Sequence, residues 1–336
     1  MSKYILGIDQ GGSKTVAAIS DIYGNILGVG KSGGGSHYAS GIDMAMSLIK
    51  TAVDAAVAHA GIGNTDFHKV YAGLSGADFR DEYDMLTDSL EKTLRCANIH
   101  VVNDCIIAMR TGITRREGAI LCAGTGLNCA VRNAVGDEFI FGYYIDDMHQ
   151  GGGALGMQAL NAVFSAESMV GAKTILTDRV LAHFGMQSVD ALLQAHVMNT
   201  LDADNRKTLT YVLDECSEAG DSVALAILEG FGRACYRYFE AGLRKLDMAN
   251  PALELVLSGG VFKCKNPIML NTIRELVALS FPNVRIVEAR LEPVAGAIML
   301  GLDSLSERGV LTDDVLCNIQ NSCARHGLIR KPEITI

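Results

Sequence analysis

The chain begins with three short apolar segments separated by tight polar turns. Residues 3–8 predict a strand, residues 9–14 carry the glycines and polar groups of a turn, and residues 15–20 predict a second strand. A further turn at 21–25 leads to a third apolar segment at 26–30. Because both connections are short, we expect the three strands to pair antiparallel as a meander.

The same design recurs in the second half of the chain. Apolar segments at 118–122, 128–133 and 138–143 predict three more strands, and glycine-containing turns at 123–126 and 135–137 separate them. One meander of this kind has no special meaning, but two copies that each begin half of the chain predict a duplicated fold. We therefore expect two related α/β domains that face each other.

Strands and helices alternate after each meander. In the first half, strands at 70–74 and 99–102 alternate with helices at 43–59 and 81–95, and another helix begins at 106–110. This alternation predicts parallel strands added to the edge of the meander. The second half repeats the plan with strands at 253–257 and 284–287 and with helices at 154–165, 173–183, 206–219, 221–246, 267–280 and 294–302. The final stretch shows only a weak helical pattern, between residues 313 and 326.

Composition narrows the classes of function. The 336 residues are 49% apolar and 20% charged, which is enough apolar material for two domains or one large one. The net charge of −9 argues against a nucleic-acid partner, and no apolar run reaches the roughly 18 residues that span a bilayer. Charged residues follow the start too soon for a signal peptide. Nine scattered cysteines without a C-x-x-C pair predict neither a zinc site nor a disulfide framework, so we expect a cytoplasmic location.

Three glycine-rich turns follow apolar strands, at 9–15, 124–126 and 258–262. Each turn has two interpretations: glycine serves a hairpin that needs a positive φ, or it lets backbone N–H groups approach phosphate oxygens. Asp9 stands at the end of its strand, where a carboxylate has no role in a core but can orient water on Mg²⁺. We expect the three turns to converge at one end of the sheets, where open α/β sheets bind ligands.

Five motifs in this order resemble the sugar kinase, heat-shock protein 70 and actin superfamily, at 7–15, 102–104, 122–129, 257–261 and 292–297. Within it, the chain looks like the BadF/BadG/BcrA/BcrD-type ATPases and N-acetylglucosamine kinases over residues 3–302. The resemblance implies a duplicated actin-like (ribonuclease H-like) α/β fold with two domains around a nucleotide cleft. It places an N-terminal domain at 1–115, a C-terminal domain at 116–302 and an extension at 303–336.

The resemblance also implies roles around ATP and Mg²⁺. The aspartate that matches Asp104 is the catalytic base of the family, although an aspartate that opens a helix is also a good N-cap. Asp9 would hold the magnesium ion. Contacts to the nucleotide are expected from Asp9, Gly11, Gly12, Ser13, Lys14, Thr15, Gly124, Thr125, Gly126, Gly259 and Gly260.

The predicted sugar pocket departs from the family pattern. Gln150 stands where the family has a carboxylate that binds a sugar hydroxyl, and an amide accepts through one oxygen only. Asp146 and Asp147 are close enough to compensate, or they are solvated loop acids. His37 follows three glycines and is either a ligand contact or a surface histidine. The expected sugar contacts, of which Asn128 matches the family's asparagine, are Ser36, His37, Asn103, Asn128, Asp147 and Gln150.

Together these features predict a kinase that transfers the γ-phosphoryl group of ATP to a hydroxyl of a sugar, with an amino sugar such as N-acetylglucosamine as the expected acceptor. The alternatives are an ATPase of the BadF/BadG type that couples hydrolysis to a partner protein, and a nucleotide-binding relative with an altered substrate. A sugar-sensing regulator would need a helix-turn-helix before the strand that starts at residue 3. We expect a small-molecule sugar as partner, with no nucleic acid and no membrane, and a homodimer is common among relatives.

Overall fold

The computed structural model describes residues 4–63, 67–305 and 311–330, and these ranges contain two five-stranded sheets. The first sheet has the strand order β3-β2-β1-β4-β5, and the second has the order β10-β9-β6-β7-β8. The strands of the first sheet are β1 (Tyr4–Gln10), β2 (Lys14–Asp21), β3 (Ile26–Gly33), β4 (Lys69–Leu74) and β5 (Ile99–Asn103). Those of the second sheet are β6 (Gly118–Ala123), β7 (Leu127–Arg132), β8 (Glu138–Ile140), β9 (Glu254–Ser258) and β10 (Arg285–Glu288).

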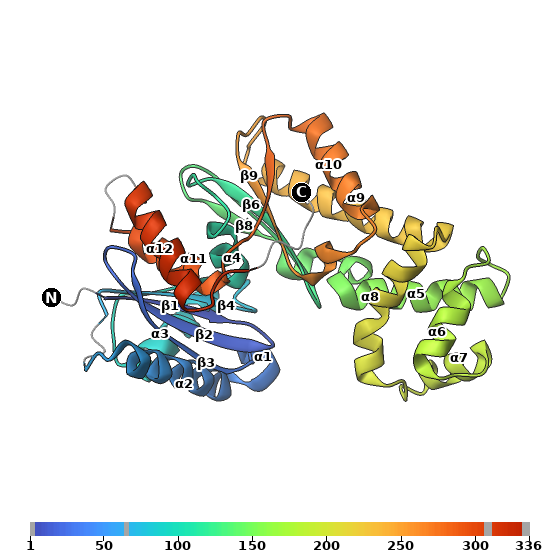
Figure 1. The fold of residues 1–336 in the computed structure, drawn as a ribbon, viewed down its shortest axis with the longest axis horizontal. Coiled ribbons are helices and arrows are strands. Elements are labelled where there is room, and N and C mark those ends of the chain that lie inside the picture. Colours follow the sequence, from blue (N-terminus) through green and yellow to red (C-terminus); the bar gives the residue numbers. More distant parts are fainter. Residues whose placement is uncertain (1–3, 64–66, 306–310, 331–336) are drawn as a thin grey trace.

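The two sheets share one topology. In each, an antiparallel meander supplies three strands, and the pairs β1–β4, β4–β5, β6–β9 and β9–β10 are parallel. The second sheet from β8 to β10 therefore has the same order as the first sheet from β3 to β5. The predicted duplicated α/β fold is confirmed, and Figure 1 shows the first sheet in blue and cyan and the second in green and orange.

Helices cover both faces of the first sheet. Leu6 and Ile8 of β1 pack with α2 on one face, whereas Ile5 packs with α11 and α12 on the other. Because successive side chains of a strand point to opposite faces, burial on both sides explains the continuous apolar run of β1. The helices around this sheet are α1 (His37–Ser40), α2 (Ile42–Ala60), α3 (Arg80–Leu94), α4 (Asp104–Arg110), α11 (Pro293–Asp303) and α12 (Asp313–Arg325).

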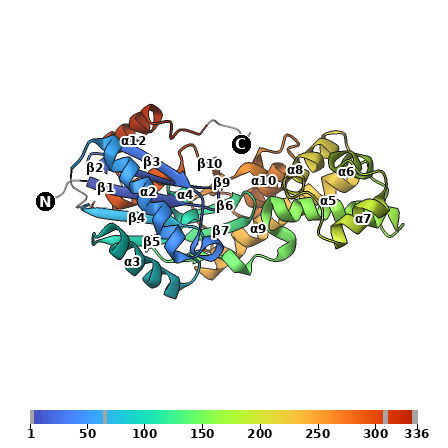
Figure 2. The ribbon, with the colours of Figure 1, turned by 90° about the horizontal axis from the view of Figure 1, so that it is seen from below.

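A helical lobe extends from the second sheet. Figures 1 and 2 both show α6 and α7 at the end of the molecule that is remote from the first sheet. Among the helices of the described ranges, none has the length and hydropathy that a membrane span requires. The helices of this half are α5 (Gly151–Glu167), α6 (Leu176–Phe184), α7 (Val189–Val197), α8 (Ala203–Glu218), α9 (Ser222–Lys245) and α10 (Ile268–Ser280).

Apart from shifts at the ends of elements and the unpredicted four-residue α1, two elements differ from the sequence-based prediction. β8 ends at Ile140 and not at residue 143, because the backbone turns at Gly142, with a φ of +44°, into a short 3₁₀ helix. α7 is absent from the prediction, since a helix of 9 residues offers little periodicity to read. The weak helical pattern between 313 and 326 corresponds to α12.

The chain returns to the first sheet after it completes the second. α11 contacts β1 and α4, and α12 contacts β3, as the two red helices beside the blue strands show in Figure 1. The boundaries at 115/116 and 302/303 stay predictions. From the packing, we propose that α11 and α12 group with the N-terminal half.

α4 and α11 cross at a distance that only glycine permits. A Cβ at Gly296 of α11 would lie 1.8 Å from the carbonyl oxygen of Ile107 on α4. Ile107 and the neighbouring Ala297 are fully buried in the apolar cluster between the two sheets. Because α4 begins at Asp104, this crossing also fixes the position of that carboxylate.

Gly296→Ala should destabilise the protein, because the added methyl group forces the two helices apart. We expect a loss of about 1–3 kcal/mol in the free energy of unfolding, measured with denaturant. Gly230 on α9 is the matched control, since a Cβ there meets no heavy atom within 4 Å. Gly230→Ala should leave stability unchanged or raise it by about 0.5–1 kcal/mol. Equal losses in both variants would show that the α4–α11 crossing is not tight.

Candidate active site

The parallel strands of the first sheet bring two carboxylates to one edge. In the register of β1, β4 and β5, Asp9 lies opposite Gly73, and Gly73 lies opposite Val102. Asp104 follows as the first residue of α4. Because parallel strands end at the same edge of a sheet, Asp9 and Asp104 face a common space.

The second sheet supplies two glycine turns to the same region. β6 and β9 are parallel neighbours, with Cys122 opposite Ser258, so the turns that follow them start at one level. Gly259 has a φ of +109°, and a Cβ there would lie 2.2 Å from the carbonyl oxygen of Ala123. Both the backbone angle and the close approach exclude a side chain. The two turns therefore lie against each other.

A cavity of about 680 Å³, here called the main cavity, lies between the two sheets and is lined by residues from both. It brings together most residues of the predicted site, although they come from separate parts of the chain. These are Asp9, Gly12, Ser13, Ser36, Asn103, Asp104, Gly124, Thr125, Gly126, Asn128 and Gln150.

Two smaller cavities continue the main cavity. The first, of about 420 Å³, shares Ser258 and Arg330 with it and is bordered by the predicted Gly259 and Gly260. The second, of about 510 Å³, shares residues 124–125 with the main cavity. The cleft therefore has room for an elongated ligand that passes both glycine turns of the second sheet.

Three residues of the predicted first phosphate turn lie outside the wall of the main cavity. The N–H of Gly11 donates to the carbonyl of Lys14 at 3.0 Å, which closes the β1–β2 hairpin. The buried hydroxyl of Thr15 donates to the carbonyl of Gly33 at 2.9 Å. Lys14 pairs with Glu292 at 2.6 Å. The middle of the turn is thus the part that faces the cavity.

Two residues of the predicted sugar pocket also point elsewhere. His37 turns toward Glu82, with 3.5 Å between Nε2 and Oε1, and Asp147 is exposed on the loop before α5. Tyr38 lines the cavity where His37 was expected, and its hydroxyl donates to the Glu82 carboxylate. Ser36 lines the cavity and also caps α1.

Two amides from opposite halves meet on the cavity wall. The Nδ2 of Asn103 donates to the carboxylate of Asp78 at 2.7 Å, and its Oδ1 accepts from the N–H of Cys105 at 3.0 Å. Asn103 is therefore the N-cap of α4, and Asp104 is not needed for that role. Asn128 on β7 reaches across the cleft, with 3.4 Å between its Nδ2 and the Oδ1 of Asn103.

Burial sets the protonation of the two central carboxylates. Burial first, and the nearby charge of Asp78 second, raise the pKa of Asp104 to about 6. Burial and then the charge of Asp104 raise the pKa of Asp9 to about 7, against a lowering by Lys14 and Arg330. Each carboxylate can thus exchange a proton near neutral pH, where general bases are most effective.

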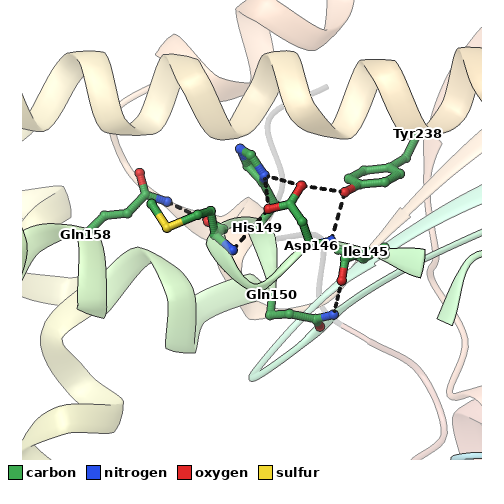
Figure 3. Close-up of polar contacts among 7 residues, drawn as sticks. Ile145, Asp146, His149, Gln150, Gln158 and Tyr238 are labelled. Carbon is green, nitrogen blue, oxygen red and sulfur yellow. Dashed lines mark hydrogen bonds and ion pairs between the residues drawn. The ribbon is translucent and has the colours of Figure 1, made fainter. Parts of the chain in front are cut away.

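The loop before α5 orients Gln150. Its Nε2 donates to the carbonyl oxygen of Ile145 at 2.8 Å, as Figure 3 shows. Because a carbonyl oxygen only accepts, this bond fixes which end of the amide is nitrogen. A Cβ at Gly126 would lie 3.7 Å from Oε1 of Gln150, so that oxygen faces the second glycine turn. Gln150 therefore presents a neutral acceptor to the main cavity.

Asp146 holds the same loop in place. It accepts from the hydroxyl of Tyr238 at 2.8 Å and from the N–H of Met148 at 3.0 Å, and it lies 2.7 Å from Nδ1 of His149 (Figure 3). Burial raises the pKa of Asp146, but hydrogen bonds from Tyr238 and His149 outweigh it and lower the pKa. Neither Asp146 nor Asp147 lines the main cavity, so this loop adds no carboxylate to the wall beside Gln150.

The cavity wall also contains residues that the sequence analysis does not select, among them Ser75, Asp78, Tyr143 and Arg330. Ser75 and Asp78 belong to a turn with glycine after β4, which is the same signal that marks the other turns. Tyr143 stacks on Phe79 from the other half, with 5.6 Å between ring centroids and 9° between planes. Arg330 comes from the C-terminal extension, where no local pattern points to a site.

Metal binding in the cleft would rest on Asp9. The described part of the chain holds no group of three or more His, Cys, Asp or Glu residues arranged for a metal ion. Mg²⁺ usually keeps several waters and is held by one or two carboxylates together with phosphates of the substrate. A single carboxylate beside the glycine turns, 7% exposed, fits an ion of this kind.

Comparison with known proteins gives consistent matches. The model of the BadF/BadG/BcrA/BcrD ATPase family matches residues 6–301. An N-acetylmuramic acid/N-acetylglucosamine kinase of Clostridium acetobutylicum is 28% identical over 303 residues, which cover 89% of this chain and 98% of that protein. An N-acetyl-D-glucosamine kinase of Dictyostelium discoideum is 26% identical over 320 residues, which cover 90% and 99%. The structure of a candidate N-acetylglucosamine kinase from Chromobacterium violaceum has the same fold, with a TM-score of 0.64 at 19% identity, covering 88% and 98%.

Asp104→Asn should make the ligand-free protein more stable at pH 8. The pKa of Asp104 is raised from 3.8 to about 6 in the folded state, so the folded protein binds more protons than the unfolded chain between these values. The stability of the wild type therefore falls as the pH rises through this window. The asparagine avoids the buried charge, and we expect a gain on the order of 1 kcal/mol or more at pH 8.

The gain should disappear below about pH 4, where both states of the wild type carry a protonated Asp104. Denaturant unfolding at both pH values measures it, and Asp147→Asn, at an exposed carboxylate, is the control that should show no gain. A difference that does not depend on pH would mean that the Asp104 charge is not the cause.

Proposed function

Because the chain belongs to the BadF/BadG/BcrA/BcrD ATPase family, we propose that it is an ATP-dependent kinase that transfers the γ-phosphoryl group to a hydroxyl of an amino sugar. Both curated relatives described above are named as kinases of N-acetylglucosamine or N-acetylmuramic acid. The observation that carries the proposal is the main cavity, where Asp104 meets two glycine turns. A base and a phosphate cradle are the parts that phosphoryl transfer needs.

Asp104 is the proposed general base. It lines the main cavity at the start of α4, while Asn103 provides the helix cap. Its pKa, raised by burial to about 6, leaves it ionised yet basic at neutral pH. The carboxylate would accept the proton of the sugar hydroxyl as that oxygen attacks the γ-phosphorus. A base positioned in this way typically contributes about 10²–10⁴-fold to the rate.

The glycine turns are the proposed cradle for the polyphosphate. Gly12, Ser13, Thr125 and Gly126 line the main cavity, and their backbone N–H groups and hydroxyls would bind the phosphate oxygens. Asp9 would hold Mg²⁺, which when bound neutralises charge on the phosphate oxygens. Asp9 must then be ionised although burial raises its pKa to about 7, and a nearby cation favours the ionised form.

The 510 Å³ cavity is the proposed adenosine site. It is lined by Gly260 and Val261 after β9 and by Thr210 and Tyr211 on α8. Tyr211 is 67% exposed, and its ring offers a face on which a base could stack. Since this cavity joins the main cavity at the second glycine turn, a nucleotide bound there would direct its phosphates toward Asp104.

The acceptor sugar would occupy the part of the main cavity around Ser36, Asp78, Asn128 and Gln150. Asp78 offers a carboxylate on one wall, and Gln150 offers the neutral Oε1 on the other. The hydroxyls of the acceptor would therefore meet a charged acceptor from the first half and a neutral one from the second. This differs from the family pattern, in which the position of Gln150 carries the charge.

ATP consumption should depend on an amino sugar. The test is a screen with N-acetylglucosamine, glucosamine, N-acetylmuramate, glucose and no sugar. Equal consumption with and without sugar would favour the ATPase alternative.

Asp104→Asn should lower kcat by about 10²-fold or more while the affinity for ATP stays close to that of the wild type. In the wild type, kcat/KM should fall as the pH drops below about 6, because protonation removes the base.

Gln150→Ala should raise the KM for the sugar by about tenfold, because a buried hydrogen bond to the acceptor is lost, with little change in the KM for ATP. Gln158→Ala is the matched control: Nε2 of Gln158 donates to the carbonyl of Met148 in the same loop, and Gln158 does not line the main cavity. Steady-state kinetics with both substrates measure the effect. Similar changes in both variants would mean that Gln150 only supports the loop.

A further inference from the structure

The C-terminal segment reaches the cleft after α12. Ile329 forms an isolated antiparallel bridge with Leu291, and the N–H of Arg330 donates at 2.8 Å to a backbone carbonyl of the segment before α11. The N–H of Glu292 donates to the carbonyl of Leu328 at 2.9 Å. Leu291 and Leu328 are buried in the apolar cluster beneath the first sheet. The backbone at Arg330 is thereby fixed to the N-terminal half.

The side chain of Arg330 extends from this segment to the second sheet. Its Nη1 donates to Oγ of Ser258, at the end of β9, at 3.0 Å. The guanidinium lies on the wall that also carries Asp9, Gly12 and Gly126. The side chain is 29% exposed, so part of its donor surface is open to the cleft.

Glu292 connects Arg330 with a second cation. Its Oε1 lies 3.5 Å from Nε of Arg330, and its Oε2 lies 2.6 Å from Nζ of Lys14, beside the first glycine turn. One carboxylate thus holds two cations near the turns. A polyphosphate carries more charge and more oxygens than one carboxylate, so it would compete well for the same donors.

We propose that Arg330 is a phosphate-binding residue of the nucleotide site, and that Glu292 is the counterion that phosphate oxygens displace when the nucleotide binds. This inference rests on the proposed function, since it takes the ligand to be a nucleoside triphosphate. The planar guanidinium suits phosphate oxygens because it offers parallel N–H donors. Arg330 lies outside residues 6–301, so the match to the family model does not include it.

The alternative is a purely structural role, in which Arg330 only fastens the C-terminal segment to Ser258. The two roles differ in what they predict for ligands with and without phosphate. A phosphate-binding residue affects ATP but not adenosine, whereas a structural fastener affects both ligands, through stability, or neither.

Calorimetric titration of the full chain with Mg·ATP and with adenosine tests the proposal. Arg330→Gln should weaken ATP binding by at least about tenfold, the loss expected for charge-assisted hydrogen bonds, and should change adenosine binding less than twofold. Arg325→Gln, which removes an exposed arginine at the end of α12, is the matched control and should bind both ligands like the wild type. Unchanged ATP binding by a folded Arg330→Gln protein would overturn the proposal, as would an equal loss for ATP and adenosine.

Two further variants complete the test. Arg330→Lys keeps the charge and should bind ATP with an affinity between those of the wild type and Arg330→Gln; it replaces the glutamine variant if thermal unfolding shows that protein to be misfolded. Glu292→Gln should bind ATP at least as tightly as the wild type, because the competing carboxylate is gone, and weaker binding would overturn its role as counterion. The titrations need no sugar, so a wild type that binds ATP without sugar-dependent turnover would refute the kinase and not the role of Arg330.

Discussion

Two carboxylates share a poorly solvated cleft, and the rest of the structure holds them there. Asp9 and Asp104 each have a pKa raised mainly by burial, and Asp104 raises the pKa of Asp9 further by its charge. Such an arrangement costs stability, because a buried charge without a strong partner is unfavourable. The nearby cations Lys14 and Arg330 lower this cost at Asp9. The two carboxylates therefore reduce the stability of the folded protein wherever the pH ionises them.

Duplication explains how one cleft receives groups from distant parts of the chain. Each sheet ends its parallel strands at one edge, and the two edges face each other across the main cavity. The first sheet contributes the carboxylates, and the second contributes glycine turns whose close packing is fixed at Gly259. α4 lies between the sheets and crosses α11 where Gly296 packs on Ile107, in the helix that Asp104 begins. Asp104 and the glycine turns are thus positioned by the same apolar core.

Local sequence signals were sufficient for the strands, the meanders and the three glycine turns, because strand periodicity and turn chemistry involve neighbouring residues only. They could not show which side chains face the cavity: the hydroxyl of Thr15 bonds Gly33 of β3, and His37 turns toward Glu82. Asp78 was within reach of the same turn signal but was not selected. Arg330 could not be found from a local signal. Its position depends on the bridge between Ile329 and Leu291 and on a contact with Ser258, which lies 72 residues earlier in the chain.

The contacts across the cleft differ in kind from those behind it. Behind it, Ile107, Ala297 and their neighbours form a dry apolar cluster in which a shift of one methyl group is costly. Across it, the two halves touch through the stack of Tyr143 on Phe79 and through two polar contacts: the amides of Asn103 and Asn128, at 3.4 Å, and the bond of Arg330 to Ser258, at 3.0 Å. Polar groups of this kind can exchange a protein partner for a ligand oxygen at little net cost. A ligand that binds these polar groups would replace contacts across the cleft and leave the apolar cluster behind it intact. The two halves could then close on a ligand while their packed junction stays fixed.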